Sequence, residues 1–147
     1  MALVQNKKAT FNYELLDTFE AGAALLGTEV KSIRKGQGSL DGAHVVIRGE
    51  EAFLVGSTIP PFQQANAPDD YDPERPRKLL LSKKELAALH YGSEQQGLTI
   101  VPLKWYNNGR NLKLEIALAR GKKKFDKREK IKKRDVDRDL GRSLKNR

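Results

Sequence analysis

Apolar and polar side chains alternate in several short segments of the chain, which is the pattern of half-buried β-strands. Residues 112–119 (LKLEIALA) place leucine or isoleucine at every second position, and residues 98–106 (LTIVPLKWY) are rich in β-branched and aromatic side chains. The sequence NNG at residues 107–109 joins them and predicts a hairpin. Pro102 has no backbone N–H to donate, so we expect a sheet edge or a bulge at that position.

Two more strand regions are predicted earlier in the chain. Residues 43–59 (AHVVIRGEEAFLVGSTI) have the pattern of a second hairpin that turns around residues 49–51. Residues 10–17 (TFNYELLD) are a further strand candidate, followed by a short strand near residues 23–26. Residues 59–77 are rich in proline and aspartate, which predicts an irregular surface loop.

Helix signals are fewer than strand signals. In the segment SKKELAALHYG, Ser82 is a predicted N-cap with Glu85 three residues later, and Gly92 is expected to end the helix. The segment GTEVKSIRKG predicts a second, short helix. Its inward residues are expected to be Val30 and Ile33, and its outward residues Glu29, Lys31 and Arg34. Short strands, hairpin turns and two small helices together predict a mainly β fold, an OB-fold-like antiparallel β-barrel.

The C-terminal segment differs from this barrel in charge. Residues 120–147 carry fourteen basic and five acidic side chains, a net charge of +9 that equals the formal charge of the whole chain. Residues 1–119 therefore have no net charge, and we divide the chain into a β-barrel, residues 1–120, which we expect to bind RNA, and a basic C-terminal tail, residues 121–147. Such a tail is typical of segments that bind phosphates or membrane surfaces, and a tail that only aids solubility is the alternative.

Apolar residues of the tail recur at helical spacing. Val136, Leu140 and Leu144 are four residues apart and form one thin stripe, while Gly141 lowers helix stability by about 1 kcal/mol relative to alanine. An isolated helix of this kind is marginal in water. We therefore expect the tail to be disordered alone and helical when bound to a partner.

Residues that would indicate catalysis or metal binding are sparse. His44 lies in a strand pattern and His90 near a helix end, and neither has a carboxylate at a suggestive spacing, so a structural or exposed histidine is the better interpretation. Asp69, Asp70 and Asp72 stand in the proline-rich loop, where solubilising acids are commoner than metal ligands. We expect no enzymatic activity, no metal and no cofactor.

No segment has the apolar length of a signal peptide or a membrane span. The chain also has no cysteine, which agrees with a reducing compartment. We expect a soluble, cytoplasmic protein without a membrane partner.

One aromatic residue, Phe125, stands inside the basic tail. Between Lys124 and Lys127 its ring can stack on an unpaired base while the lysines hold the backbone, a contact of about 1–3 kcal/mol. The alternative is that Phe125 packs on the barrel where the tail departs, and composition does not separate the two.

Two acids of the barrel also bear on RNA binding. Glu20 in FEAGAALLG and Glu29 in GTEVKS would repel phosphates. A carboxylate on an RNA-binding face is useful if it accepts from base N–H groups or a 2′-hydroxyl, or if it orients a neighbouring cation. The residues alone slightly favour the alternative, a surface acid paired with Lys31 or Lys35.

The chain resembles the SmpB family, the bacterial SsrA-binding proteins, from about Asn6 to Asp135. Four segments carry the resemblance in the family's order: NKKATFNYELLDTFEAGAALLGTEVKSIRKG, RPRKLLLSKKEL, GLTIVPLKWY and EIALARGKKKFDKRE. The motifs GTEVKSIR and GKKxxDKR are the most specific. The family's fold agrees with the predicted barrel.

The resemblance implies a ribosome-rescue factor of trans-translation without catalytic activity. Such proteins bind the tRNA-like domain of transfer-messenger RNA (SsrA RNA) and accompany it, with elongation factor Tu and GTP, to ribosomes stalled on messages without a stop codon. The barrel takes the place of an anticodon arm, and the tail enters the empty decoding centre and mRNA channel. The implied partners are transfer-messenger RNA, small-subunit ribosomal RNA and, through the charged RNA, elongation factor Tu; we expect a monomer.

Carried over motif by motif, the resemblance assigns contacts with the tRNA-like domain to Glu20, Leu80 and Ser82. Matching motifs nearby add Asn6, Lys7, Tyr13, Glu29, Lys31 and Arg34. The implied tail residues at the ribosome are Gly121, Lys122, Lys123, Phe125, Asp126, Lys127 and Arg128.

Two positions depart from the family pattern. Ser82 stands where an amide or imidazole is common, so we expect a weaker RNA contact or an N-cap role instead. Phe125 stands where histidine is frequent, which preserves stacking on a base but removes any role that depends on protonation. The alternatives are a ribosomal or general RNA-chaperone protein without a unique RNA and, less well supported, a metal-dependent RNA-processing enzyme using Glu20 or Asp41.

Overall fold

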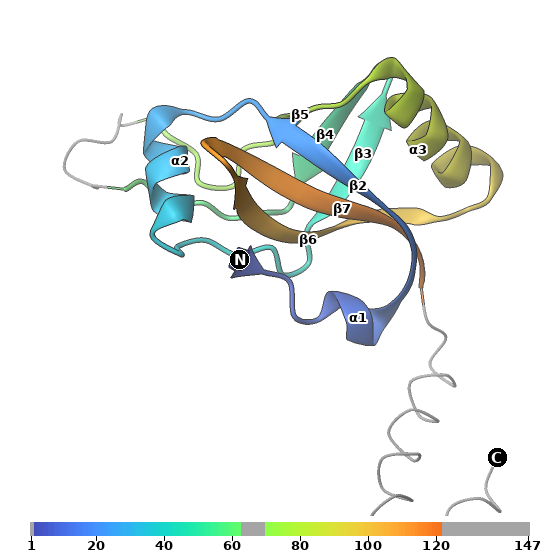
Figure 1. The fold of residues 1–147 in the computed structure, drawn as a ribbon, viewed down its shortest axis with the longest axis horizontal. Coiled ribbons are helices and arrows are strands. Elements are labelled where there is room, and N and C mark those ends of the chain that lie inside the picture. Colours follow the sequence, from blue (N-terminus) through green and yellow to red (C-terminus); the bar gives the residue numbers. More distant parts are fainter. Residues whose placement is uncertain (1, 63–69, 122–147) are drawn as a thin grey trace, which may run out of the picture.

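The computed structural model describes residues 2–62 and 70–121. Within these ranges seven strands form one antiparallel sheet accompanied by three helices (Figure 1). The strands are β1 (Ala2–Gln5), β2 (Tyr13–Ala23), β3 (His44–Arg48), β4 (Glu51–Val55), β5 (Arg77–Leu80), β6 (Thr99–Asn108) and β7 (Asn111–Gly121). The helices are α1 (Ala9–Asn12), α2 (Gly27–Arg34) and α3 (Lys83–Gln95).

The sheet closes on itself. Six strands follow one another in the order β6, β3, β4, β5, β2 and β7, and β7 pairs again with β6, so the ring is complete. Strand β1 lies outside this ring and pairs with the second half of β6. The predicted mainly β fold, an antiparallel barrel with small helices, is confirmed.

The interior of the ring is filled by alternate side chains of the strands. Leu114 and Ile116 of β7 are fully buried, and Trp105 of β6 is the largest fully buried side chain. Ile33 of α2 and Leu89 of α3 are also fully buried, and the two helices lie at opposite ends of the sheet in Figure 1. The removal of these apolar surfaces from water is the main stabilising contribution to the fold.

Both predicted hairpins are present. Strands β6 and β7 pair as far as Asn108 and Asn111, and Gly109 in the turn has a φ of 65°, which glycine adopts without strain. Strands β3 and β4 are joined by residues 49–50. The β6–β7 register shifts after Pro102, so the predicted bulge is confirmed. The alternative, an edge strand, is wrong, because β6 pairs with other strands on both sides.

The N-terminal region differs from the prediction. Residues 10–12 belong to α1 rather than to a strand, and β2 continues unbroken to Ala23, so the predicted short strand near residues 23–26 is absent from the described fold. The register of β2 against β7 shifts between Leu15 and Thr18, which interrupts the alternation expected along a regular strand. Strands β1 and β5 have no counterpart among the predicted strands, because four residues are too few to show a period.

Helix α3 begins as predicted and ends later. The Ser82 hydroxyl accepts a hydrogen bond from the Glu85 backbone N–H at 3.1 Å, and the Glu85 carboxylate accepts from the Ser82 N–H at 3.0 Å. The prediction that Gly92 ends the helix is wrong, because α3 continues to Gln95. A Cβ at Gly92 would lie 2.7 Å from Leu118 Cδ2, so this glycine allows the helix to pack closely on β7.

Strand β7 ends at Gly121, which pairs with Tyr13 of β2. The strand therefore extends one residue beyond the predicted boundary between barrel and tail. The rest of the predicted tail, with the expected coupling of its helix to binding, lies outside the described residues.

Candidate nucleic-acid interface

Polar side chains lie in register on the outer surface of three neighbouring strands. Glu20 of β2 is opposite Glu115 of β7, which is in turn opposite Lys104 of β6. The residues that follow or precede them, Ala21, Leu114 and Trp105, are buried, so strand alternation directs the charged side chains outward. We define the outer face as Glu20, Leu80, Lys104, Tyr106, Asn108 and Glu115.

Two neutral donors from β6 hold the Glu20 carboxylate. The Tyr106 hydroxyl donates to Oε2, and the Asn108 amide donates to Oε2 at 3.2 Å and to Oε1 at 3.4 Å. Within the described part of the chain Glu20 forms no ion pair with Lys31 or Lys35, so the expectation of such a pair is wrong.

The Tyr106 hydroxyl is a permanent donor. Burial, the hydrogen bond to Glu20 and the negative charges of Glu20 and Glu115 together raise the pKa of Tyr106 far above its ordinary value. The Lys104 ammonium lies 5.6 Å from the centre of the Tyr106 ring, within the range of a cation–π contact. Tyr106 is therefore held on its edge by a carboxylate and on its face by a cation.

Leu80 supplies the apolar part of the outer face. It pairs with Gly22 of β2, and the residue is 54% exposed. A Cβ at Gly22 would lie 3.3 Å from the Leu80 Cβ, so the bare glycine backbone leaves room for Leu80 against β2. Because Glu20 and Gly22 are two residues apart on one strand, a hydrogen-bond acceptor and an apolar surface are neighbours here.

Ser82 is exposed and follows Leu80 by two residues, at the start of α3. Its hydroxyl is used in capping the helix, so the predicted N-cap role is confirmed. That its contact with RNA is correspondingly weak stays a prediction.

Glu29 occupies a different environment from the one predicted. The expectation that it faces solvent, with Lys31 or Lys35 as partner, is wrong, because its side chain is 0% exposed. Arg77, also 0% exposed, donates to Glu29 Oε2 from Nη2 at 2.7 Å and from Nε at 3.0 Å, and Arg75 donates to both carboxylate oxygens. Direct contact between Glu29 and RNA does not fit this burial.

The buried Glu29 cluster joins separate parts of the chain. The Leu26 backbone N–H and the Tyr71 hydroxyl also donate to Glu29, at 2.8 Å and 3.1 Å. Burial by itself raises the pKa of Glu29, but the hydrogen bonds from Arg75, Leu26 and Arg77 outweigh it and hold that pKa below its ordinary value. Glu29 is therefore charged, and it fixes the start of α2 to the segment that precedes β5.

The two predicted cations of α2 are both exposed. Lys31 projects from the helix, and the Arg34 guanidinium donates to the backbone carbonyl of Arg110 at 2.8 Å. Arg110 lies in the β6–β7 turn, two residues after Asn108. Arg34 therefore borders the outer face.

Three other predicted contacts lie between β1 and the start of β2. The Asn6 side chain donates to the carbonyl of Pro102 at 2.8 Å and so covers the bulge of β6. Lys7 is exposed, and Tyr13 pairs with Gly121 at the end of β2 remote from Glu20. The structure thus brings Glu20, Leu80 and Ser82 together and places Asn6, Lys7 and Tyr13 elsewhere.

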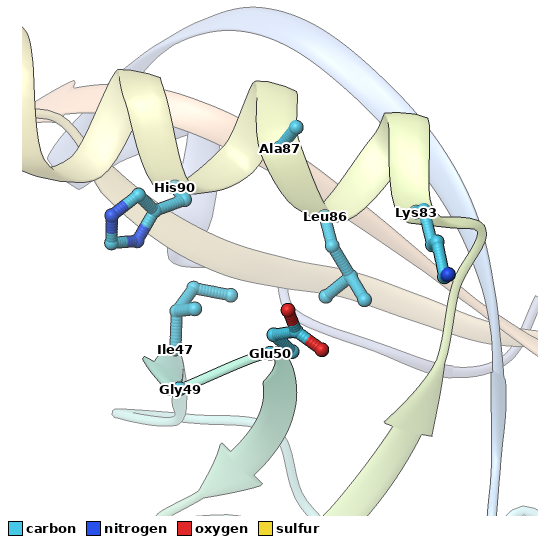
Figure 2. Close-up of a pocket in the computed structure, with 7 residues that line it drawn as sticks. All are labelled: Ile47, Gly49, Glu50, Lys83, Leu86, Ala87 and His90. Carbon is cyan, nitrogen blue, oxygen red and sulfur yellow. The ribbon is translucent and has the colours of Figure 1, made fainter.

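A partly enclosed hollow of about 340 Å³ lies between α3 and the β3–β4 hairpin. Figure 2 shows His90 and Leu86 of α3 directed toward Ile47 and Glu50 of the hairpin. Lys83, the first residue of α3, also lines it.

The structure also bears on the residues considered for catalysis or metal binding. His44 and His90 are both exposed. The prediction for each was a structural or an exposed histidine, and the structure shows the second. Asp72 accepts the backbone N–H of Glu74 at 2.9 Å, Asp70 is exposed, and Asp69 lies outside the described residues. In the described ranges no three His, Cys, Asp or Glu side chains are placed to hold a metal ion, and no helix there is long and apolar enough to cross a bilayer.

Tail residues implied for ribosome binding lie outside the described structure, except Gly121. They are Lys122, Lys123, Phe125, Asp126, Lys127 and Arg128. Whether Phe125 stacks on a base or packs on the barrel therefore stays open.

The sequence prediction missed four residues that shape these two sites. Tyr106 and Asn108 are more than eighty positions from Glu20, and Arg75 and Arg77 are more than forty from Glu29. No local spacing links such distant residues. The only available signal was that Tyr106 follows Trp105 in a strand and therefore faces outward if Trp105 faces inward.

Comparison with known proteins identifies relatives along nearly the whole chain. The SmpB protein family matches residues 3–146. An SsrA-binding protein of Beijerinckia indica is 52% identical, over 96% of this chain and 90% of the relative, and one of Microcystis aeruginosa is 48% identical, over 97% and 93%. A solved structure described as "tmRNA-SmpB: a journey to the center of the bacterial ribosome" contains a chain that is 45% identical, with a TM-score of 0.68 over 82% of this chain and 84% of that one.

Proposed function

The chain belongs to the SmpB family, and on this premise we propose that it binds transfer-messenger RNA and acts with it in trans-translation on the ribosome. The observation that carries the proposal is the family match over residues 3–146, which includes both the barrel and the basic tail. We further propose that the protein works as a cytoplasmic monomer, without catalysis of its own, and meets elongation factor Tu only through the charged RNA.

The barrel is the part that we propose to select the RNA. Its net charge is zero before residue 120, so general attraction to phosphates does not come from the barrel as a whole. The outer face instead offers a fixed carboxylate at Glu20 and an exposed apolar side chain at Leu80. Such groups recognise unpaired bases and 2′-hydroxyls, which a folded tRNA-like domain presents in its loops.

The tail is the part that we propose to contact the ribosome. Its positive charges suit ribosomal RNA and the empty mRNA channel, with Phe125 stacking on a base of the decoding centre. Gly121, which still pairs with Tyr13, is the last residue of β7 and precedes this segment in the sequence. The proposed ribosome-facing residues are Gly121, Lys122, Lys123, Phe125, Asp126, Lys127 and Arg128.

A competition experiment tests RNA selection. The full chain is bound to labelled transfer-messenger RNA, and unlabelled bulk tRNA or ribosomal RNA is added at increasing concentration. We expect neither competitor to displace the protein at equal concentration. Displacement at equal concentration would instead support a general RNA-chaperone or ribosomal protein.

A truncation tests the division of labour between barrel and tail. The chain should end after Gly121 rather than after Arg120, because Gly121 still pairs with Tyr13. We expect this variant to keep its affinity for the isolated transfer-messenger RNA and to lose peptide tagging on stalled ribosomes. In the full chain, Phe125→Ala should slow tagging more than Phe125→His; equal rates would assign Phe125 to packing.

A further inference from the structure

We propose that Tyr106 and Asn108 are positioning residues that hold the Glu20 carboxylate to accept a hydrogen bond from RNA. This inference rests on the function proposed above and names the chemistry of its outer face. Both donors are neutral, and both belong to β6, two strands away from Glu20. Neither residue was among the contacts that the sequence implied.

The sheet geometry explains why a tyrosine is needed. Strand β7 lies between β2 and β6, so the backbones of the two outer strands are roughly 10 Å apart. The Tyr106 side chain crosses over β7 to reach Glu20, and phenylalanine at this position would lack the atom that makes the bond. The Lys104 ammonium on the ring face keeps the side chain over β7.

Electrostatics explain why Glu20 needs to be held. Glu115 lies directly opposite Glu20, and like charges in such cross-strand pairs repel. Left alone, the Glu20 side chain would rotate away from Glu115 into solvent. Two donors from β6 instead fix one rotamer without neutralising the charge.

The carboxylate keeps capacity to accept from RNA. Oε2 receives both the Tyr106 hydroxyl and the Asn108 amide, whereas Oε1 has only the long Asn108 contact of 3.4 Å. An ionised carboxylate accepts and does not donate, so the group that it reads in RNA is a base N–H or a ribose 2′-hydroxyl. Leu80, beyond Gly22 on the next strand, offers the apolar surface for the base or sugar that carries this donor.

The test is the substitution Tyr106→Phe in the full chain, with Tyr91→Phe as its matched control. Tyr91 is 58% exposed on α3 and has no hydrogen bond within the described structure. We expect Tyr106→Phe to weaken binding to the tRNA-like domain about tenfold, since a hydrogen bond to a charged group is lost. The salt dependence of binding should not change, because no phosphate-binding charge is removed. Equal affinities for the two variants would overturn the proposal.

A double-substitution cycle separates positioning from a structural role. In a Glu20→Ala background, Tyr106→Phe should change the dissociation constant less than about twofold, because no acceptor is left at residue 20 for Tyr106 to position. A tenfold loss in that background as well would show that Tyr106 acts independently of Glu20 and would overturn the proposal. The urea midpoints of all variants identify any loss that merely follows unfolding.

The RNA donor is identified with two series of modified RNAs. One carries single 2′-deoxy substitutions, and the other replaces single bases of each type by analogues that lack one N–H donor, such as inosine for guanosine. When a substitution removes the donor that Glu20 contacts, wild type and Tyr106→Phe should bind the modified RNA with equal affinity. The series in which this occurs shows whether the donor belongs to the sugar or to the base. If no substitution in either series reduces the difference in RNA affinity between wild type and Tyr106→Phe, the inference fails. If the wild type does not prefer the tRNA-like domain over bulk tRNA, the proposed function fails first and the inference with it.

Discussion

Glu20 and Glu29 are only nine residues apart in the sequence, yet they occupy opposite environments. Glu20 lies on the outer face and is held by neutral donors, whereas Glu29 is buried and held by two arginines. A carboxylate held by neutral donors keeps its negative charge and can still accept further hydrogen bonds. Two guanidinium groups instead neutralise the charge and occupy the acceptor positions. The comparison teaches that the exposure of an acid and the partners around it together decide whether it can bind a ligand or only stabilise the fold.

The strongest test of this comparison is Glu29→Ala. The substitution leaves Arg77 buried without its counter-ion, and breaking a buried pair in this way costs about 3–5 kcal/mol of unfolding free energy. Urea denaturation followed by circular dichroism measures the loss. Glu20→Ala in parallel should lower the unfolding free energy by less than about 1 kcal/mol, in line with exposed groups. A similar loss in both variants would contradict the distinction.

The reverse effect is expected in RNA binding. Glu20→Ala should weaken binding to the tRNA-like domain by about tenfold to a hundredfold, as for loss of a hydrogen bond to a charged group. Fluorescence anisotropy with labelled RNA measures this effect. The control is Glu14→Ala, which removes an exposed acid paired with Arg120 at the other end of β2. If the two variants bind alike, the outer face does not select the RNA.

The pH dependence of stability gives a smaller signal that belongs to Glu29. Its pKa is lower in the folded protein than the ordinary value of 4.5, so its contribution is complete above that pH and is lost as the pH falls through the folded pKa. Between pH 6 and about pH 3, the urea midpoint of the wild type should therefore fall more steeply than that of Glu29→Gln. Parallel curves would mean that Glu29 is not the group that is protonated.

The smallest effect is expected at an ion pair that is neither buried nor placed on the outer face. Glu51 and Lys78 are 2.6 Å apart, with both side chains about half exposed. Glu51→Ala should change the unfolding free energy by about 0–1 kcal/mol, because solvent screens such pairs. If Glu51→Ala lowered the unfolding free energy nearly as much as Glu29→Ala, burial would not be what determines the size of the loss.

Local sequence pattern predicted the barrel well where a period extends over enough residues. The β6–β7 hairpin, the bulge at Pro102 and the N-cap at Ser82 all follow from neighbouring residues, and all are present. Local pattern did not predict the short elements, because each has only four residues. These are strands β1 and β5 and the helix at residues 9–12. Gly92 was misinterpreted because its role is a contact with Leu118, twenty-six positions away.

The candidate site shows the same division. The family motifs led to Glu20, Leu80 and Ser82, which the structure places at one end of the barrel. The residues that determine how Glu20 and Glu29 behave come from distant strands and loops, and pairing across a sheet is a property of the closed ring rather than of any segment. Those partners required the structure.

Strand β2 determines the distance between two points on the barrel surface. It begins at Tyr13, next to Gly121, and at its other end Gly22 is next to Leu80. At about 3.3 Å per residue these two points are roughly 30 Å apart, slightly less for the bulge. Strand β2 thus sets the separation between Gly121, the last residue of β7, and whatever binds at Leu80.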